Sequence, residues 1–166
     1  MAMILKKLSH DAIPRALERA DRYRLLNEPV QAESICLDIL AVDPDNQDAL
    51  RTLLLALTDQ FGHGYQLAEI QPKNVIARLK SEYEREYYTG IVAERRAKEF
   101  LDQHSDPSGH TAHDFLTSAL AHYERAADLR PPGNDDALLR WNTCARLLNS
   151  HGVHAPTEEP ADTLLE

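Results

Sequence analysis

The sequence has few of the residues that an all-β or disulfide-stabilised protein needs. Among 166 residues it contains six Gly, two Cys, three Phe and one Trp. Six Gly are too few for the many tight turns of an all-β chain. The two cysteines, Cys36 and Cys144, fall in apolar helical patterns, where buried and reduced thiols are expected. A disulfide between them is the alternative, and its geometry cannot be read from the sequence.

Long apolar runs and an excess of basic residues are also missing. No stretch of about 18 or more apolar residues occurs, so no membrane-spanning segment is predicted. Residues 1–8 lack an apolar run of the length a signal peptide needs, and the cytoplasm is the expected location. The net charge is −9. An acidic chain lacks the clustered Lys and Arg that attract phosphate backbones, so no nucleic-acid partner is predicted.

The motifs of common catalytic sites are absent as well. The sequence has no Gly-rich phosphate loop, no Gly-x-Ser-x-Gly and no His-Glu-x-x-His. We interpret the charged residues of segment 82–96 as a solvated helix face rather than a polar active site. No enzyme activity and no cofactor are therefore predicted.

Four histidines raise the question of a metal site. Three of them, His104, His110 and His113, surround one loop, and His122 follows on the next predicted helix. Imidazole is a good ligand for zinc and nickel. Because no Cys and no Glu-x-x-His pair accompanies these residues, we interpret them as solvated histidines and predict no metal.

The pattern that is present is helical. Apolar residues recur three and four apart, and Pro, Asn, Asp and Gly residues separate the repeats of this pattern. We expect six or seven helices, at about 12–26, 29–42, 47–60, 72–103, 111–129 and 135–149. The short breaks make neighbouring helices antiparallel. The predicted organisation is a short N-terminal segment (1–10), a helical domain (11–150) and an acidic disordered tail (151–166).

A repeat is visible within this helical domain. Residues Ala20, Tyr23, Ala32, Cys36 and Pro44 resemble a tetratricopeptide repeat, a helix pair of about 34 residues in which small residues lie at the helix crossing and Pro ends the second helix. The same frame fits a second set of residues, Ala119, Tyr123, Ala126 and Pro131. The chain departs from the pattern at Ile39, where a small residue is usual.

The resemblance implies a right-handed stack of antiparallel helix pairs. The separation of Pro44 and Pro131 exceeds two such repeats, so extra residues are expected at 61–72 and 104–110, and the middle repeat is irregular. Gly90, inside the long predicted helix, costs about 1 kcal/mol against Ala. We therefore expect a close helix contact there. Glu94 and Lys98, four residues apart, are expected to form a surface ion pair.

In proteins of this family the partner lies in a concave groove made by the first helix of each pair. The resemblance places sixteen residues of this chain on that face: Leu17, Asp21, Arg24, Leu25, Asp48, Arg51, Leu55, Glu84, Tyr87, Ile91, Glu94, Arg95, Asp135, Leu138, Asn142 and Arg146. We expect partner contacts mainly from Arg24, Arg51, Leu55, Tyr87, Arg95, Asn142 and Arg146. Arginine forks recognise carboxylates, so an acidic segment is the expected guest.

Other interpretations remain open. The four arginines can be ordinary solvated charges near acidic residues of their own helices. The chain can also be a helical protein with a small-molecule or metal site near the long helix and the histidine loop. A third possibility is a structural subunit that self-assembles. Trp141 is expected to cover the last face of the stack; if that face stays open, a second copy can dock there as a homodimer.

Overall fold

The structure is a computed structural model that describes residues 2–63, 67, 70–102, 109–150 and 153–155, and this part of the chain is helical without a strand. A 3₁₀ turn, η1 (His10–Ala12), precedes the helices. They are α1 (Ile13–Leu25), α2 (Pro29–Val42), α3 (Gln47–Asp59), α4 (Pro72–Ile76), α5 (Glu82–Asp102), α6 (His110–Leu129) and α7 (Asp136–Leu148). The predicted all-α class is confirmed.

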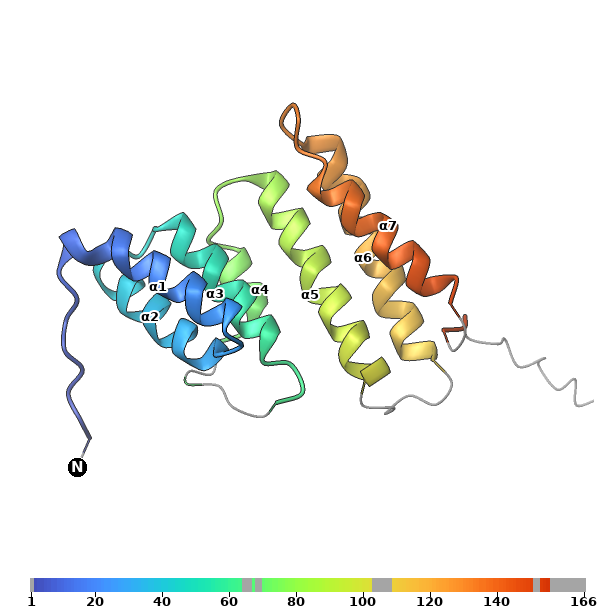
Figure 1. Cartoon of the computed structure of the whole chain (residues 1–166). Coiled ribbons are helices and arrows are strands. Elements are labelled where there is room, and N and C mark those ends of the chain that lie inside the picture. Colours follow the sequence, from blue (N-terminus) through green and yellow to red (C-terminus); the bar gives the residue numbers. More distant parts are fainter. Residues whose placement is uncertain (1, 64–66, 68–69, 103–108, 151–152, 156–166) are drawn as a thin grey trace, which may run out of the picture.

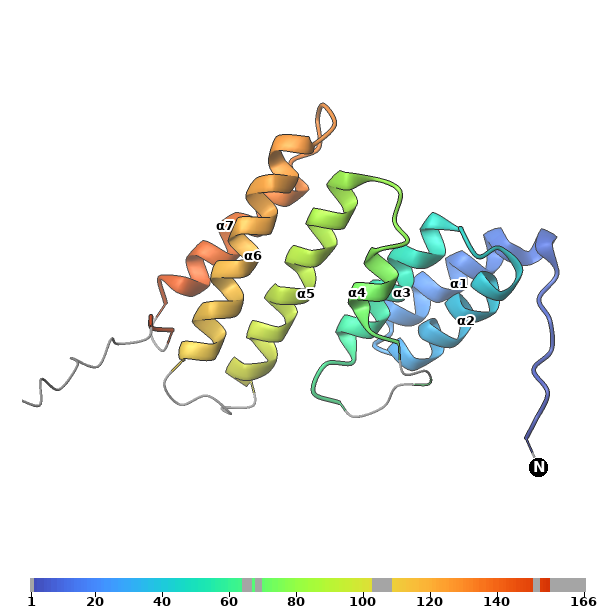
Figure 2. The ribbon, with the colours of Figure 1, turned by 180° about the vertical axis from the view of Figure 1, so that it is seen from behind.

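The helices form a row rather than a closed bundle (Figure 1; Figure 2). Each helix packs on its neighbour in sequence, and α3 also contacts both α1 and α5. The α5–α6 pair shares the most extensive contact, whereas α3 and α4 touch α5 through few residues. Helices α1 and α7 therefore lie at opposite ends of the molecule. None of the described helices combines the length and apolar character needed to cross a membrane.

Small and branched apolar side chains make the core of the first three helices. Ala20 of α1 and Ala32 of α2 are fully buried, as the repeat pattern predicts for helices that approach closely. Cys36 and Cys144 are both buried free thiols, and burial raises the pKa of each to about 12. The reduced state expected from the sequence is confirmed. Asn46 begins α3 by accepting a hydrogen bond from the Ala49 amide at 2.9 Å.

The predicted long helix at 72–103 is wrong, because the chain breaks between α4 and α5. The Ser81 hydroxyl accepts a hydrogen bond from the Glu84 amide at 3.3 Å, so Ser81 starts a new helix. A Ser followed three residues later by Glu is a capping-box signature that the apolar stripe concealed. A long-range contact also holds the break: the Gln47 side chain accepts from the Lys80 amide at 2.9 Å.

The expected close contact at Gly90 is confirmed. A Cβ atom added to Gly90 would lie 2.6 Å from Cε1 of Tyr123, which is shorter than carbon atoms tolerate. Tyr123 of α6 is fully buried, and its ring lies against the α5 backbone at this position. The missing side chain therefore allows α5 and α6 to pack around an aromatic ring.

The predicted tail at 151–166 lies almost wholly outside the described residues. Only 153–155 are described, and Val153 is buried against the core. Trp141 is half-buried on α7, and its indole N–H donates to Glu124 of α6 at 3.1 Å.

Candidate partner-binding surface

Polar contacts link the helices that the resemblance assigns to the first position of each pair. The Thr52 hydroxyl of α3 donates to Asp21 of α1 at 3.1 Å. The preceding residue, Arg51 of α3, donates through Nη1 to Glu84 of α5 at 2.7 Å. These contacts run across α1, α3 and α5 on one side of the row. A polar ladder therefore joins neighbouring helices along this surface.

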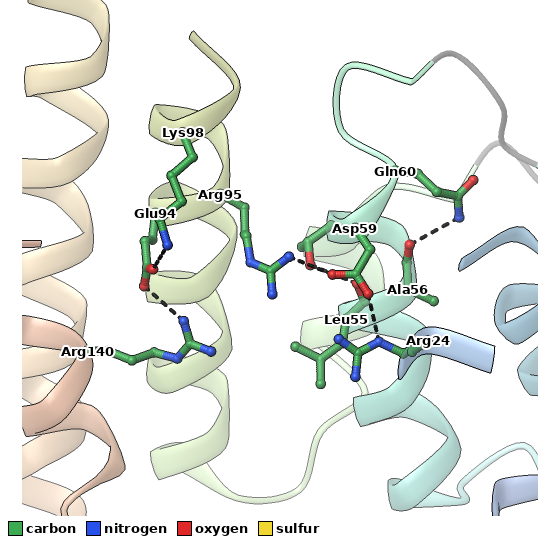
Figure 3. Close-up of polar contacts among 10 residues, drawn as sticks. Arg24, Leu55, Ala56, Asp59, Gln60, Glu94, Arg95, Lys98 and Arg140 are labelled. Atoms are coloured by element: carbon green, nitrogen blue, oxygen red, sulfur yellow. Dashed lines mark hydrogen bonds and ion pairs between the residues drawn. The ribbon is translucent and has the colours of Figure 1, made fainter. Parts of the chain in front are cut away.

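Asp59, the last residue of α3, is the centre of this ladder. Its Oδ2 accepts from Nε of Arg24 on α1 at 2.8 Å, and its Oδ1 accepts from Nη1 of Arg95 on α5 at 2.5 Å (Figure 3). The Asp59 side chain remains 18% exposed. Two guanidinium groups thus share one carboxylate, which leaves a local excess of one positive charge. Each arginine has five N–H donors, so several stay available after these bonds.

A cleft of about 330 Å³ opens beside Asp59 and its two arginines, a group that we call the Asp59 clamp. It lies between α1, the end of α3 and the second half of α5. Its lining residues are Arg24, Asn27, Thr58, Asp59, Phe61, His63, Arg95, Lys98, Glu99 and Asp102. Among its acidic residues, Glu99 forms an ion pair with Arg96, whose Nη1 lies 2.8 Å from Oε2 of Glu99. The cleft therefore presents three cationic side chains beside carboxylates that are already partly engaged.

The joint between α3 and α5 is held largely by polar groups. Few residues of the two helices approach closely, and Arg51–Glu84 and Arg95–Asp59 cross it as ion pairs. The guanidinium carbon of Arg96 also lies 3.5 Å from the centre of the Phe61 ring. A cation over an aromatic face contributes about 0.5–1 kcal/mol at exposed sites. The predicted groove arginines therefore also connect the two halves of the row.

The structure places Arg24, Arg51 and Arg95 on one surface, in an arrangement that neither interpretation of the sequence anticipated. They are not free charges, because each pairs with a carboxylate. Only Arg51 pairs within its own helix, with Asp48, and it also reaches α5. Leu55 is half-buried on α3, and its side chain lies beside the Asp59 clamp (Figure 3).

Tyr87 lies farther along the same surface. Its ring stacks on Tyr83 with centroids 5.7 Å apart and meets Tyr88 edge-on at 5.3 Å. Its hydroxyl accepts from Nε of Arg140 on α7 at 3.2 Å. The predicted site residue is therefore half-buried and engaged with α7.

The α7 residues at the surface differ from those expected. A second cleft of about 370 Å³ separates α5 from α7, and α7 contributes Asp136, Leu139, Arg140 and Thr143 to it. Asn142 and Arg146 do not line this cleft, and Arg146 is exposed without a recorded hydrogen bond or ion pair in the described part of the chain. The helical frame taken from the repeat is thus displaced on α7, where Arg140 rather than Arg146 faces α5.

Glu94 forms a second carboxylate centre, buried at the floor of this cleft. It accepts from Lys98 at 2.5 Å and from Arg140 at 3.1 Å (Figure 3). It also accepts from the Tyr123 hydroxyl at 2.6 Å. Its side chain is 1% exposed. The predicted Glu94–Lys98 pair is present, but its carboxylate is not at the surface as expected. Burial raises the pKa of Glu94, yet the hydrogen bonds and nearby positive charges outweigh it and lower the pKa overall.

Sequence reasoning missed the roles of Tyr123 and Arg140 at this centre. A signal was present, because Glu94 follows Ile91 by three residues and precedes Ala97 by three, within the apolar stripe of α5. A charge in such a stripe needs a partner when it is buried. The partner on α7 could not be read from local sequence, because it lies 46 residues away.

The histidines do not assemble in the described part of the chain. Among these residues no group of His, Cys, Asp and Glu has an arrangement that could hold a metal ion, and His104 lies outside them. His122 of α6 instead meets Glu86 of α5, with Nδ1 2.7 Å from the carboxylate. Arg125 donates to the same carboxylate at 3.0 Å.

The chain was compared with protein-family models, with curated proteins and with solved structures. None of the three comparisons gave a match.

Proposed function

We propose that this chain is a protein- or peptide-binding adaptor of the tetratricopeptide type, whose partner lies along the surface of α1, α3, α5 and α7. The packing order supports this proposal, since α3 contacts α1 on one side and α5 on the other, as the first helices of successive pairs do in a stack. The short helix α4 then takes the second position of an irregular middle repeat.

The observation that carries the proposal is the sharing of Asp59 by Arg24 and Arg95 at the wall of an open cleft. A guest carboxylate entering the cleft can accept from the unused N–H groups of both arginines. Hydrogen bonds between charged groups are stronger than neutral ones, and a planar guanidinium suits a carboxylate. Lys98, which also donates to the buried Glu94, lines the same cleft, as do the carboxylates of Asp59, Glu99 and Asp102. We therefore propose an acidic segment as the guest.

The energetics of the clamp are compatible with exchange. Ion pairs between partly exposed side chains contribute about 0–1 kcal/mol to stability, and the side chains of Arg24, Asp59 and Arg95 are all partly exposed. Turning one guanidinium group from Asp59 toward a guest therefore costs little free energy of folding. Half-buried Leu55 lies beside the clamp and offers apolar contact to a neighbouring residue of the guest.

Peptide binding measured by fluorescence anisotropy tests the proposal. Three peptides of equal length are used, in which leucine alternates with glutamate, glutamine or lysine. We expect the glutamate peptide to bind most tightly and a variant with Arg24→Gln and Arg95→Gln to lose about tenfold in affinity, the equivalent of about 1.4 kcal/mol. The matched control is Arg125→Gln, which removes an arginine from an ion pair on the α5–α6 surface.

Two results would contradict the proposal. One is equal binding of the glutamate peptide by the wild type and the Arg24/Arg95 variant. The other is preferential binding of the lysine peptide, which would assign the surface to a basic guest. A loss in the Arg125→Gln control equal to that of the double variant would show a general charge effect and would also count against the cleft.

A further inference from the structure

The outer face of α1 carries three arginines that differ from most others in the molecule. Arg15, Arg19 and Arg22 are exposed and share one side of the helix, with Glu18 beside them. None of the three makes a hydrogen bond or ion pair within the described part of the chain. Apart from Arg146, every other arginine there donates to a carboxylate or a backbone carbonyl or lies over an aromatic ring. A shallow hollow of about 490 Å³ lies between these side chains.

This end of an acidic protein is basic. Between Lys6 and Arg22 the chain has five basic and three acidic residues, although the whole chain has a net charge of −9. Met3, Ile4 and Leu5 at the same end are 85–95% exposed. Exposed apolar side chains that gather in one region are typical of a surface that binds a partner.

The complementary sequence is found in the chain itself. Segment 156–166 contains four acidic residues, Glu158, Glu159, Asp162 and Glu166, and no Lys or Arg. It also contains two adjacent leucines, 164 and 165. We infer that the outer face of α1 binds the acidic segment 156–166 of a second copy of this chain.

The spacing of charges supports this occupant. Arg15 and Arg22 are separated by about 10 Å along a helix that rises 1.5 Å per residue. An extended chain rises about 3.3–3.6 Å per residue, so carboxylates three residues apart in an extended guest can span about 10 Å, and Glu159 and Asp162 have this sequence separation. The two carboxylates can therefore meet the first and last arginine of the face together.

The reach of the chain argues for a second copy rather than the same molecule. Helix α7 packs on α6, so the path of packed helices from α7 to α1 runs through α6, α5 and α3. Four steps of about 8–10 Å each make this path about 32–40 Å. From Ala155, the last described residue, Glu159 can reach about 14 Å and Asp162 about 25 Å. A tail supplied by another molecule has no such restriction.

The test uses the full chain and measures its mass by sedimentation velocity over a range of concentrations and salt. We expect the wild type to associate at low salt and to dissociate as salt rises, because exposed charges are screened. Changing Arg15, Arg19 and Arg22 together to Glu is expected to raise the dissociation constant at least about tenfold. These side chains pair with no group among the described residues, so the fold should persist, which circular dichroism checks.

A charge exchange makes the test specific. A second variant reverses the charge of segment 156–166 through three substitutions, Glu158→Lys, Glu159→Lys and Asp162→Lys. Each variant alone should be monomeric, whereas an equimolar mixture should associate again, because the acidic α1 face of one then meets the basic tail of the other. Arg146→Glu is the matched control, since this arginine is also exposed and unpaired, and it should associate like the wild type.

Several outcomes would overturn the inference. They are a wild type that stays monomeric at all concentrations, unchanged association in either charge variant, or no recovery in the mixture. Binding of the wild type to vesicles of anionic lipid, lost on changing the three arginines, would assign the face to a membrane surface if no association is seen. The inference is independent of the cleft beside Asp59, and the α1 variant should bind the glutamate peptide like the wild type.

Discussion

Asp59 and Glu94 are two carboxylates that pair with the same kind of partner, cationic side chains, in different surroundings. Each accepts from two cationic side chains, and each joins α5 to a neighbouring helix (Figure 3). Asp59 is 18% exposed at the edge of a cleft, whereas Glu94 is 1% exposed and also accepts from the Tyr123 hydroxyl. Burial, rather than the type of residue, therefore separates the two centres.

This difference assigns the two centres different roles. A buried carboxylate that loses its partners leaves charges and a hydroxyl without hydrogen bonds, which is costly. The Glu94 centre therefore fixes α5, α6 and α7 in one arrangement. At Asp59, water can replace any lost partner, so the arginines are available to a guest at little cost to the fold. In the proposed adaptor, the contacts of Glu94 thus hold the helices together, whereas the contacts of Asp59 can be exchanged for contacts with a guest.

The largest expected effect comes from removing the buried carboxylate. Glu94→Ala leaves Arg140 and the Tyr123 hydroxyl without their acceptor, and we expect a loss of about 3 kcal/mol in the free energy of unfolding. Urea denaturation followed by circular dichroism measures this value. The matched control is Glu99→Ala, one and a half turns along α5, whose ion pair with Arg96 is partly exposed. A loss no larger than in the control would contradict the role assigned to Glu94.

An intermediate effect is expected in the pH dependence of stability. The pKa of Glu94 is lowered in the folded state, because hydrogen bonds and cations outweigh the effect of burial. A carboxyl whose folded pKa is depressed contributes stability that is present above its unfolded pKa and is lost as the pH falls through the folded pKa. The wild type should therefore lose more stability between pH 6 and about pH 3 than Glu94→Gln. Parallel pH profiles for the two proteins would contradict this assignment.

The sequence was sufficient for some features and not for others. Pro29 and Asn46 correctly indicated where α2 and α3 begin, because helix caps and helix breaks depend on residues only a few positions away. Gly90 correctly indicated a close contact, since the absence of a side chain inside a helix needs a reason. The break before α5 was missed, because an apolar stripe continues across it and part of its support comes from Gln47, 33 residues earlier.

The candidate site was predictable in part for the same reason. The repeat pattern placed Arg24, Arg51 and Arg95 on one face, because helical periodicity decides which residues share a face, and in the structure each of them pairs with a carboxylate of another helix. It gave no information on their acidic partners Asp59 and Glu84, which lie on other helices. On α7 the pattern selected Arg146, whereas Arg140 meets α5. A displacement of this kind depends on how α7 packs against α6, which no local pattern encodes.

The smallest expected effect is at Asp59, and its dependence on salt completes the comparison. Asp59→Asn keeps the shape of the side chain and removes the charge shared by two arginines. Since exposed pairs contribute about 0–1 kcal/mol, we expect a loss below about 1 kcal/mol at low ionic strength. At about 1 M salt the Debye length is about 3 Å, so this loss should shrink further. The loss in Glu94→Ala should persist, because a buried centre is screened much less. Urea denaturation of both variants at low and high salt checks this, and an equal response to salt would show that burial does not distinguish the two carboxylates.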